Sequence, residues 1–378
     1  MEWTTYQLSD VCTIKKRGVT PKEGVCYALY SLPAFDKSKK PEIVYGQEIK
    51  SNKFSIQNNT ILFNKLNVRF KRVWNIKELK HSNNICSTEF FPLSVKGDVE
   101  QDFLYYYLIS DHITEILKKS LSGTSSSHQR IDLNLFLQLP INLPSISDQR
   151  KIAGILSDLD SKIENNNKIN ANLEAQAEAL FKSWFVDFTP FKDQPFVDSE
   201  LGPIPQGWKV GKLGDICTFK RGKNLLSKNA IDEGVPVVAG GLSPSCYHNQ
   251  ANTSAPVVTV SGSGANAGFM RMYHVDVWAS DCSFIDVSCD YLYFVYCFLS
   301  VNRRLLKHAQ TGAVQPHVKP ADIHDFDVVI PEEDIVKAFQ SIIKELLTKV
   351  GVNEKENQRL AALRDTLLPK LMSGEIKL

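Results

Sequence analysis

A repeating pattern of apolar residues runs through the middle of the chain and predicts one long helix. Seam positions follow one another at alternating steps of four and three from Ile152 to Trp184, with Asn166 and Asn170 near the centre. This spacing is the a/d seam of a coiled coil. No proline interrupts the pattern. We therefore predict a helix over residues 148–187 that packs against another helix.

The same seam returns 187 positions later and predicts the partner helix. Eight of ten seam positions keep their character, including both asparagines, which become Asn353 and Asn357. The two exceptions are Ala177, which becomes Arg364, and Trp184. The first seam is Ile152, Leu156, Leu159, Ile163, Asn166, Asn170, Leu173, Ala177, Leu180 and Trp184, and the second is Phe339, Ile343, Leu346, Val350, Asn353, Asn357, Leu360, Arg364, Leu367 and Leu371. A repeat of this kind organises the whole chain.

The segments that enter each half are repeated as well. Trp3 corresponds to Trp208 at an offset of 205, and a basic pair follows each entry. The pairs are Lys15 with Lys16, and Lys220 with Arg221. The predicted order is a globule over 1–145, a helix over 146–188, a linker over 189–206 rich in proline and acid, a globule over 207–330, and a helix over 331–378.

Each globule combines short β-type runs with one helix near its end. In the first, β-type runs such as residues 60–67 and 84–95 precede a predicted helix over 101–120. The second has runs such as residues 255–264 and 281–288 and a predicted helix over 291–310. We expect an α+β fold: two similar globules, each a mixed sheet with a helix, separated by two long helices in an antiparallel coiled coil.

The asparagines favour antiparallel pairing of the long helices. In that orientation Asn166 lies level with Asn357 and Asn170 with Asn353, whereas parallel pairing asks a short linker to span a helix and a globule. Buried asparagines cost stability but penalise register slips. The seam is roughly 48 Å long at about 1.5 Å per residue, or about fourteen base pairs of duplex DNA.

Composition excludes several classes of protein. The chain has 378 residues, of which 43% are hydrophobic, and no run of eighteen apolar residues that would predict a membrane span. Its first residues lack the apolar stretch of a signal peptide. The eight cysteines show no CxxC or zinc-type spacing, so we expect reduced thiols in a prokaryotic cytoplasm and no metal.

Positive charge is concentrated in the first globule. Between Val11 and Lys80 there are fifteen basic and five acidic residues, a difference of +10, with four aromatic residues interleaved. Such a field is typical of a domain that binds a polyanion. The alternative is an ordinary solvated surface.

The sequence contains no complete catalytic motif of the common classes. Residues 261–264, Ser-Gly-Ser-Gly, resemble part of a phosphate loop but are not followed by a lysine and a helix, which favours a tight turn or a binding loop without nucleotide. There is no dinucleotide-binding glycine motif, no Asn-Pro-Pro-Tyr segment of a base methyltransferase and no metal-dependent nuclease core. His128 and His317 recur in equivalent loops, where a DNA contact or a structural hydrogen bond is favoured over a catalytic pair.

Three segments resemble the specificity subunits of type I restriction-modification systems. They are residues 145–188, with Gln149 and the ending Phe-Lys-Ser-Trp-Phe; residues 201–216, with Leu-Gly-Pro-Ile-Pro-Gln-Gly-Trp; and residues 363–376, with Leu-Leu-Pro-Lys-Leu-Met-Ser-Gly-Glu-Ile. Two segments depart from the pattern. The second helix has Val336 at the position of Gln149 and has Leu371 and Met372 in place of the aromatic end. The first entry lacks the Ile-Pro-x-Gly-Trp form and keeps only Trp3.

The resemblance implies a DNA-recognition subunit without catalytic residues. Each globule would be a target recognition domain that reads one half of a bipartite, asymmetric DNA site. The helices would set the spacing and dock two methyltransferase subunits, and motor-nuclease subunits would complete the complex. S-adenosylmethionine, ATP and magnesium would then belong to the partners, with no cofactor in this chain. The alternatives are a self-contained methyltransferase or restriction enzyme, and a coiled-coil scaffold with no role in DNA binding.

The candidates for DNA contact fall into three groups. Basic pairs at the globule entries are expected to contact phosphates, and polar and basic residues in the loops before the long helices could read base edges. Four basic residues between positions 65 and 72 are further candidates in the first globule. Together the candidates are Lys15, Lys16, Lys65, Arg69, Lys71, Arg72, Gln129, Arg130, Lys220, Arg221, Gln315, His317 and Lys319. The residues expected to fix the coiled-coil register are Asn166, Asn170, Asn353 and Asn357.

Overall fold

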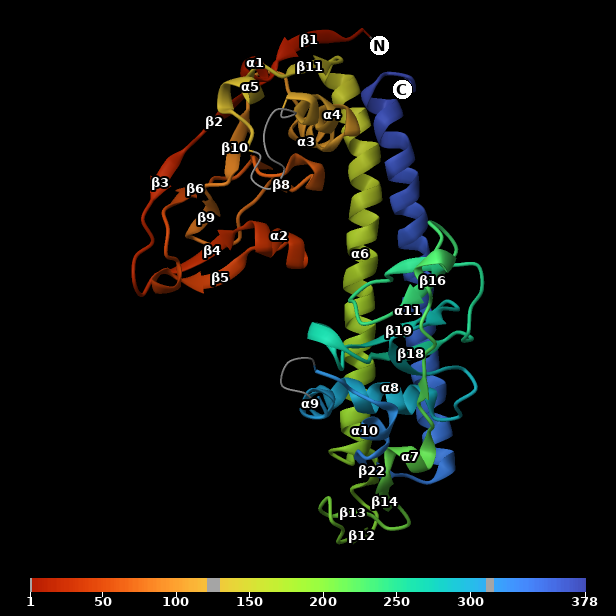
Figure 1. The fold of residues 1–378 in the computed structure, drawn as a ribbon. Coiled ribbons are helices and arrows are strands. Elements are labelled where there is room, and N and C mark those ends of the chain that lie inside the picture. The colour runs from red at the N-terminus through yellow and green to blue at the C-terminus, as the bar shows by residue number, and fades with distance from the viewer. Residues whose placement is uncertain (1, 121–129, 311–315) are drawn as a thin grey trace. The chain divides into compact units, whose positions relative to one another are not determined.

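The computed structural model describes residues 2–120, 130–310 and 316–378 (Figure 1). The chain divides into two compact units, Met1–Ile163 with Gln358–Leu378, and Glu164–Asn357. The boundary between the first unit and the second unit falls inside both long helices, α6 (Ile146–Phe185) and α11 (Glu333–Met372). Within the described residues, no helix is long and apolar enough to cross a membrane.

The first unit contains two principal sheets. The central one is antiparallel, with the strand order β2 (Cys12–Ile14), β10 (Phe90–Val95), β7 (Thr60–Asn64), β8 (Val73–Ile76). The other has the order β3 (Arg17–Val19), β6 (Lys53–Ser55), β9 (Asn84–Ser87), β4 (Cys26–Tyr30), β5 (Glu42–Tyr45), in which only β4 and β9 pair in parallel. A separate two-stranded sheet joins β1 (Thr4–Gln7) to β11 (Pro140–Leu143). The helices are α1 (Leu8–Val11), α2 (Leu32–Ser38), η1 (Gly46–Glu48), η2 (Val68–Phe70), α3 (Gln101–Ile109), α4 (Asp111–Ser120) and α5 (Leu133–Leu137).

The second unit repeats this plan with a smaller accessory sheet. Its central antiparallel sheet has the order β15 (Lys220–Arg221), β21 (Cys282–Ile285), β18 (Val257–Ser261), β19 (Met270–Tyr273). A mixed sheet orders β17 (Cys246–His248), β16 (Val235–Val238), β20 (Trp278–Ala279), and two pairs join β14 (Lys209–Lys212) to β22 (Asp327–Ile330) and β12 (Phe196–Val197) to β13 (Ile204–Pro205). The helices are η3 (Thr189–Phe191), α7 (Leu213–Ile216), η4 (Ser227–Asn229), η5 (Gly264–Asn266), α8 (Leu292–Val301), α9 (Arg303–His308) and α10 (Pro320–His324).

The long helices pair antiparallel within each unit. In the first unit, Arg364 of α11 donates to Asp160 of α6 at 2.6 Å. In the second, Asn166 donates to Asn357 at 2.9 Å and Asn353 donates to Asn170 at 2.7 Å. The predicted α+β class with antiparallel long helices is therefore confirmed. Among the described strands, parallel pairing joins β4 to β9 in the first unit and β16 to β20 in the second, whereas the two central sheets are antiparallel.

The single helix predicted near the end of each globule is in fact two helices, α3 and α4 in the first unit and α8 and α9 in the second. The expected helix over 101–120 stops at Ser110, whose backbone is extended and whose hydroxyl donates to the carbonyl of Tyr107 at 2.7 Å. The expected helix over 291–310 is interrupted at Asn302, whose side chain donates to the carbonyl of Phe298 at 2.9 Å. Short polar side chains compete with the helical backbone for its hydrogen bonds, which explains both breaks.

Apolar packing joins each globule to its share of the long helices. In the second unit, Phe294 of α8 lies 5.3 Å from Phe181 and 5.0 Å from Phe185, measured between ring centroids. Figure 1 shows α8 lying across α6 and α11 there. In the first unit, the core includes Phe103 and Tyr107 of α3 together with Ile152 and Leu371 of the long helices. The helices therefore form part of both hydrophobic cores.

Candidate nucleic-acid interface

The central sheets of the two units present the same backbone arrangement at one end. In the first unit, Lys65 donates its N–H to the carbonyl of Glu89 at 3.0 Å and accepts from Ile131 at 2.9 Å. In the second, Gly262 donates to the carbonyl of Asp281 at 3.0 Å and accepts from Val318 at 3.1 Å. Isolated bridges complete the match, because Leu66 pairs with Arg130 as Ser263 pairs with His317. Three predicted residues, Lys65, Arg130 and His317, are therefore placed by equivalent elements.

In the first unit, three cations surround one acid, and we name this group the first sheet-end cluster: Lys16, Lys65, Glu89, Phe91 and Arg130. Arg130 forms an ion pair with Glu89 at 2.8 Å. Lys16 and Lys65 lie over the ring of Phe91, at 5.4 and 5.9 Å from its centroid. Burial lowers the pKa of Lys65, Glu89 opposes this effect, and Arg130 and Lys16 reinforce it. The cluster carries a net positive charge at the end of the sheet.

In the second unit, the equivalent acid holds an arginine from a different strand. We name this group the second sheet-end cluster: Arg221, Gly262, Ser263, Asp281, His317 and Lys319. Arg221 forms an ion pair with Asp281 at 2.5 Å, and the hydroxyl of Ser263 donates to the other carboxylate oxygen. A Cβ atom at Gly262 would collide with the guanidinium of Arg221. Arg221 therefore fills the space next to Gly262, where the first unit has the side chain of Lys65.

An open hollow of about 540 Å³ lies beside the second cluster. It is lined by Arg221, Gly262, His317, Lys319, Pro320 and Ala321. None of the described residues that line it is acidic, so its surface offers cations, an imidazole and a backbone without a side chain. Such a surface suits a polyanion, because anionic oxygens accept hydrogen bonds from cationic side chains.

The remaining predicted residues lie in other positions. Arg69, Lys71 and Arg72 all belong to the hairpin between β7 and β8, but Arg72 is held by Asp36 at 2.7 Å and Lys71 by Asp111 at 2.7 Å. Lys15 is exposed next to β2, and Lys220 is exposed in β15. Gln129 and Gln315, together with His128, lie outside the described residues.

Residues 261–264 are the end of a strand and the start of a hairpin. Ser261 ends β18 and η5 follows, with no long helix after it. The turn that leads to β19 explains the glycines, because Gly264 has a φ of 80°. The segment therefore lacks the loop-to-helix geometry of a phosphate loop.

Sequence reasoning missed Glu89 and Asp281, which organise the two clusters. Each immediately precedes the strand next to the hairpin, β10 or β21, and they are 192 positions apart. Their shared position beside repeated strands is the signal that could have identified them.

The anchor between globule and long helix is also repeated, but one helical turn out of step. Gln149 accepts from the N–H of Glu100 at 2.9 Å and donates to the carbonyl of Pro144 at 3.0 Å. Gln340 accepts from the N–H of Tyr293 at 3.1 Å and donates to the carbonyl of Asp290 at 2.7 Å. Val336 does occupy the position equivalent to Gln149. Gln340, four residues later, instead ties the start of α8 to α11.

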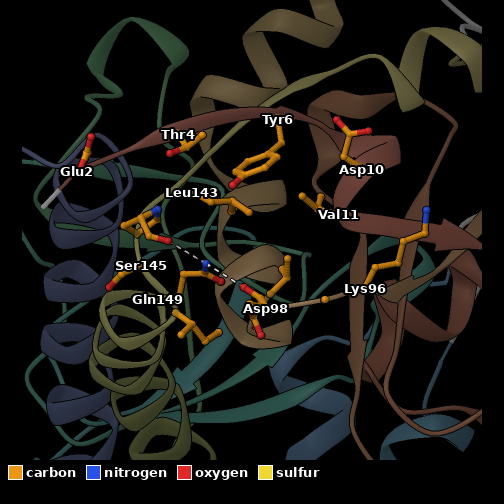
Figure 2. Close-up of a pocket in the computed structure, with 14 residues that line it drawn as sticks. Glu2, Thr4, Tyr6, Asp10, Val11, Lys96, Asp98, Leu143, Ser145 and Gln149 are labelled. Carbon is orange, nitrogen blue, oxygen red and sulfur yellow. Dashed lines mark hydrogen bonds between the residues drawn. The ribbon is translucent and has the colours of Figure 1, made fainter.

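A pocket of about 560 Å³ borders Gln149 and collects none of the predicted DNA contacts. Figure 2 shows it, with Gln149 joined to the carbonyl of Asp98 by a hydrogen bond of 3.4 Å. Its lining mixes Lys96 with the acids Glu2, Asp10 and Asp98. The pocket therefore lacks the positive character of the sheet-end clusters.

Replacing Gln149 by leucine should lower the free energy of unfolding by about 1.5 kcal/mol, since the partly buried N–H of Glu100 loses its acceptor. Urea unfolding of the variant measures this change. Gln149→Glu keeps an acceptor for Glu100 but places a carboxylate oxygen against the carbonyls of Pro144 and Asp98, so it should not recover the loss at neutral pH. Equal urea midpoints for Gln149→Leu and the unaltered chain would contradict the anchoring role.

Comparison with known proteins gives a consistent family. Residues 1–175 and 205–364 match the family described as type I restriction modification DNA specificity domain. The type I restriction enzyme MjaIX specificity subunit of Methanocaldococcus jannaschii is 31% identical over 306 residues, covering 75% of this chain and 70% of that protein. The HindI specificity subunit of Haemophilus influenzae is 25% identical over 378 residues, covering 78% and 82%.

A solved structure shares the fold. The S subunit of the type I restriction-modification system of M. genitalium superposes with a TM-score of 0.62 at 18% identity, covering 98% of this chain and 96% of that one. The resemblance based on the helix and entry segments is confirmed by these matches, as is the expectation of a recognition subunit rather than an enzyme.

Proposed function

Because the chain belongs to the type I restriction modification DNA specificity family, we propose that its two globules bind the two halves of a bipartite, asymmetric DNA site. The observation that carries the proposal is the pair of sheet-end clusters. Their backbone frames are equivalent, as the matched hydrogen bonds of Lys65 and Gly262 indicate. Equivalent frames support the same approach to a duplex, and different side chains support different base preferences.

The paired helices complete the proposal as spacer and docking surface. Exposed apolar side chains on α6 and α11 support contacts with two methyltransferase subunits: Ile155, Ile169, Ile342, Val352 and Leu363. In this proposal, motor-nuclease subunits join the same complex in a prokaryotic cytoplasm. S-adenosylmethionine, ATP and magnesium then act in the partner subunits.

Salt dependence of DNA binding tests the proposal. The chain is purified with its methyltransferase partners, and the bipartite motif is read from methylome sequencing of cells that carry the complete system. Lys16→Gln and Lys319→Gln should each weaken binding and reduce the slope of log K against log salt by about one unit if each contacts a phosphate. Lys337→Gln, which removes an exposed cation paired with Glu333 on α11, is the matched control and should leave the slope unchanged.

Three results would count against the proposal. Salt-insensitive or absent DNA binding would favour a protein scaffold. Methyl transfer by the chain without its partners would favour a self-contained methyltransferase. A methylated motif without two separated halves would refute the bipartite site.

A further inference from the structure

Two hairpins of equal length carry opposite chemistry in the two units. Strand register pairs Phe63 with Val73 in the first unit and Val260 with Met270 in the second. The connecting loops are therefore Lys65–Arg72 and Gly262–Phe269 in one common frame. The first loop reads Lys-Leu-Asn-Val-Arg-Phe-Lys-Arg and the second Gly-Ser-Gly-Ala-Asn-Ala-Gly-Phe.

Both loops place their third and seventh residues in the left-handed region. In the second loop these are Gly264 and Gly268, with φ of 80° and 78°. In the first they are Asn67 and Lys71, with φ of 53° and 41°. Glycine adopts this conformation freely, whereas other residues do so at a cost, and such strain is concentrated at functional sites. The sequence of the first loop is therefore not the one that folds most easily.

The first loop holds one aromatic ring on the surface between two arginines. Phe70 is 53% exposed. The guanidinium carbon of Arg72 lies 4.6 Å from its ring centroid and that of Arg69 lies 5.5 Å away. Arg72 is fixed by two 2.7 Å hydrogen bonds to Asp36, and Arg69 by one of 2.7 Å to Asn67. The ring is therefore presented by a set of fixed contacts.

The hairpin itself does not require this ring. In the common frame the residue equivalent to Phe70 is Ala267, which is 5% exposed. A single exposed apolar side chain is ordinary on a protein surface. Here, however, it coincides with backbone strain, fixed arginines and a counterpart that manages without it.

The contacts of the ring restrict what it can bind. Arg72 lies over the ring at 4.6 Å, which disfavours insertion between base pairs, because insertion needs both ring faces. A phenyl ring offers no hydrogen-bonding group. Arg69 beside it, whose partner Asn67 is uncharged, favours an anionic partner, and the exposed part of the ring favours an apolar group. In duplex DNA the thymine C5-methyl in the major groove has that chemistry.

We propose that Phe70 packs against the methyl group of a thymine in the half-site bound by the first globule. This inference rests on the proposed function. Arg69 and Arg72 position the ring, and Phe70 is the residue that discriminates. The second globule, with Ala267 at this place, lacks the corresponding thymine contact.

The test compares thymine with deoxyuridine, which differs only by the missing methyl. The complex with its methyltransferase partners is titrated against duplexes that carry its site, with each thymine of the first half-site replaced in turn. At one position deoxyuridine should weaken binding about fourfold, the value of one buried methyl group. Phe70→Ala should weaken binding to the thymine duplex by a similar factor and abolish the response to deoxyuridine at that position. Phe70→Leu, which keeps an apolar side chain, should retain part of the response.

The outcomes separate this proposal from the wider one. Sequence-specific binding in which no thymine position responds, or in which the effects of Phe70→Ala and deoxyuridine multiply, would overturn the Phe70 contact and leave the function intact. A first half-site without thymine on either strand would overturn it as well. Binding by the unaltered complex that shows no sequence preference would refute the proposed function itself. Equal melting temperatures of the variants and the unaltered chain exclude misfolding as the cause.

Discussion

Replacing Gly351 by alanine is expected to lower the free energy of unfolding by about 2 kcal/mol, although alanine is the better helix former. A Cβ atom at this position would lie 2.6 Å from both Cβ and Cγ of His274. The Cβ atom of His274 is held by the backbone directly after β19, so rotation of the imidazole cannot remove its overlap with the new methyl group. Overpacking of this kind costs about 3 kcal/mol, and the gain in helix propensity offsets about 1 kcal/mol.

The contact with Gly351 is part of the seat of β19 on α11. Arg271 of β19 forms an ion pair with Glu354 at 3.5 Å, one turn beyond Gly351. Burial lowers the pKa of His274, and the charge of Arg271 lowers it further. The strand end therefore approaches the helix closely at a position where any side chain would hold them apart.

Gly154 in α6 is the matched control, because nothing lies within 4 Å of a Cβ atom built there. Gly154→Ala should raise the free energy of unfolding by about 0.5 to 1 kcal/mol. Urea unfolding followed by circular dichroism compares the two variants. In the variant Gly351→Ala, the second change His274→Gly removes all the overlapping atoms and should recover part of the loss, whereas His274→Ala leaves Cβ in place and should recover less. If Gly351→Ala moved the midpoint in the same direction as Gly154→Ala, the close approach would be wrong.

The fold was largely predictable because its main signals are periodic and repeated. The heptad seams identify both long helices. The first of them, α6, spans Ile146–Phe185 and so begins and ends two residues before the predicted 148–187. Matching asparagines also indicate the direction of pairing. The breaks at Ser110 and Asn302 were not predicted, because the apolar pattern continues through them and only local polar competition ends the helices.

The sheet-end clusters were only partly predictable, because sheet pairing brings distant residues together. Glu89 and Arg130 are 41 positions apart, and Arg221 and Asp281 are 60 apart. The sequence indicates a basic segment but not which cation an acid holds. It also cannot show that Arg221 occupies the space next to Gly262, since Arg221 lies in β15 and reaches the end of β18 past the intervening strand β21.

Replacing Asn353 alone by leucine is expected to lower the free energy of unfolding by about 3 kcal/mol. Asn353 is 2% exposed and donates to Asn170, which is 9% exposed. The substitution leaves the side-chain oxygen of Asn170 without that donor in the seam, and a buried polar group that loses its partner costs about 1 to 3 kcal/mol. The remaining contact of Asn170, a donation to the carbonyl of Val350 at 3.4 Å, does not use this oxygen.

A double-mutant cycle on Asn170 and Asn353 separates pairing from packing. The double change Asn170→Leu with Asn353→Leu should recover most of the loss, because an apolar pair replaces a polar pair at two seam positions. The other asparagine pair, Asn166 with Asn357, is the control. Asn166 also donates to Glu356 at 2.8 Å, so Asn357→Leu leaves it a partner and should cost only about 1 kcal/mol. Urea midpoints of the four variants give the coupling free energy. Additive effects of the two leucines, or equal losses for Asn353→Leu and Asn357→Leu, would show that Asn170 and Asn353 do not act as a buried pair.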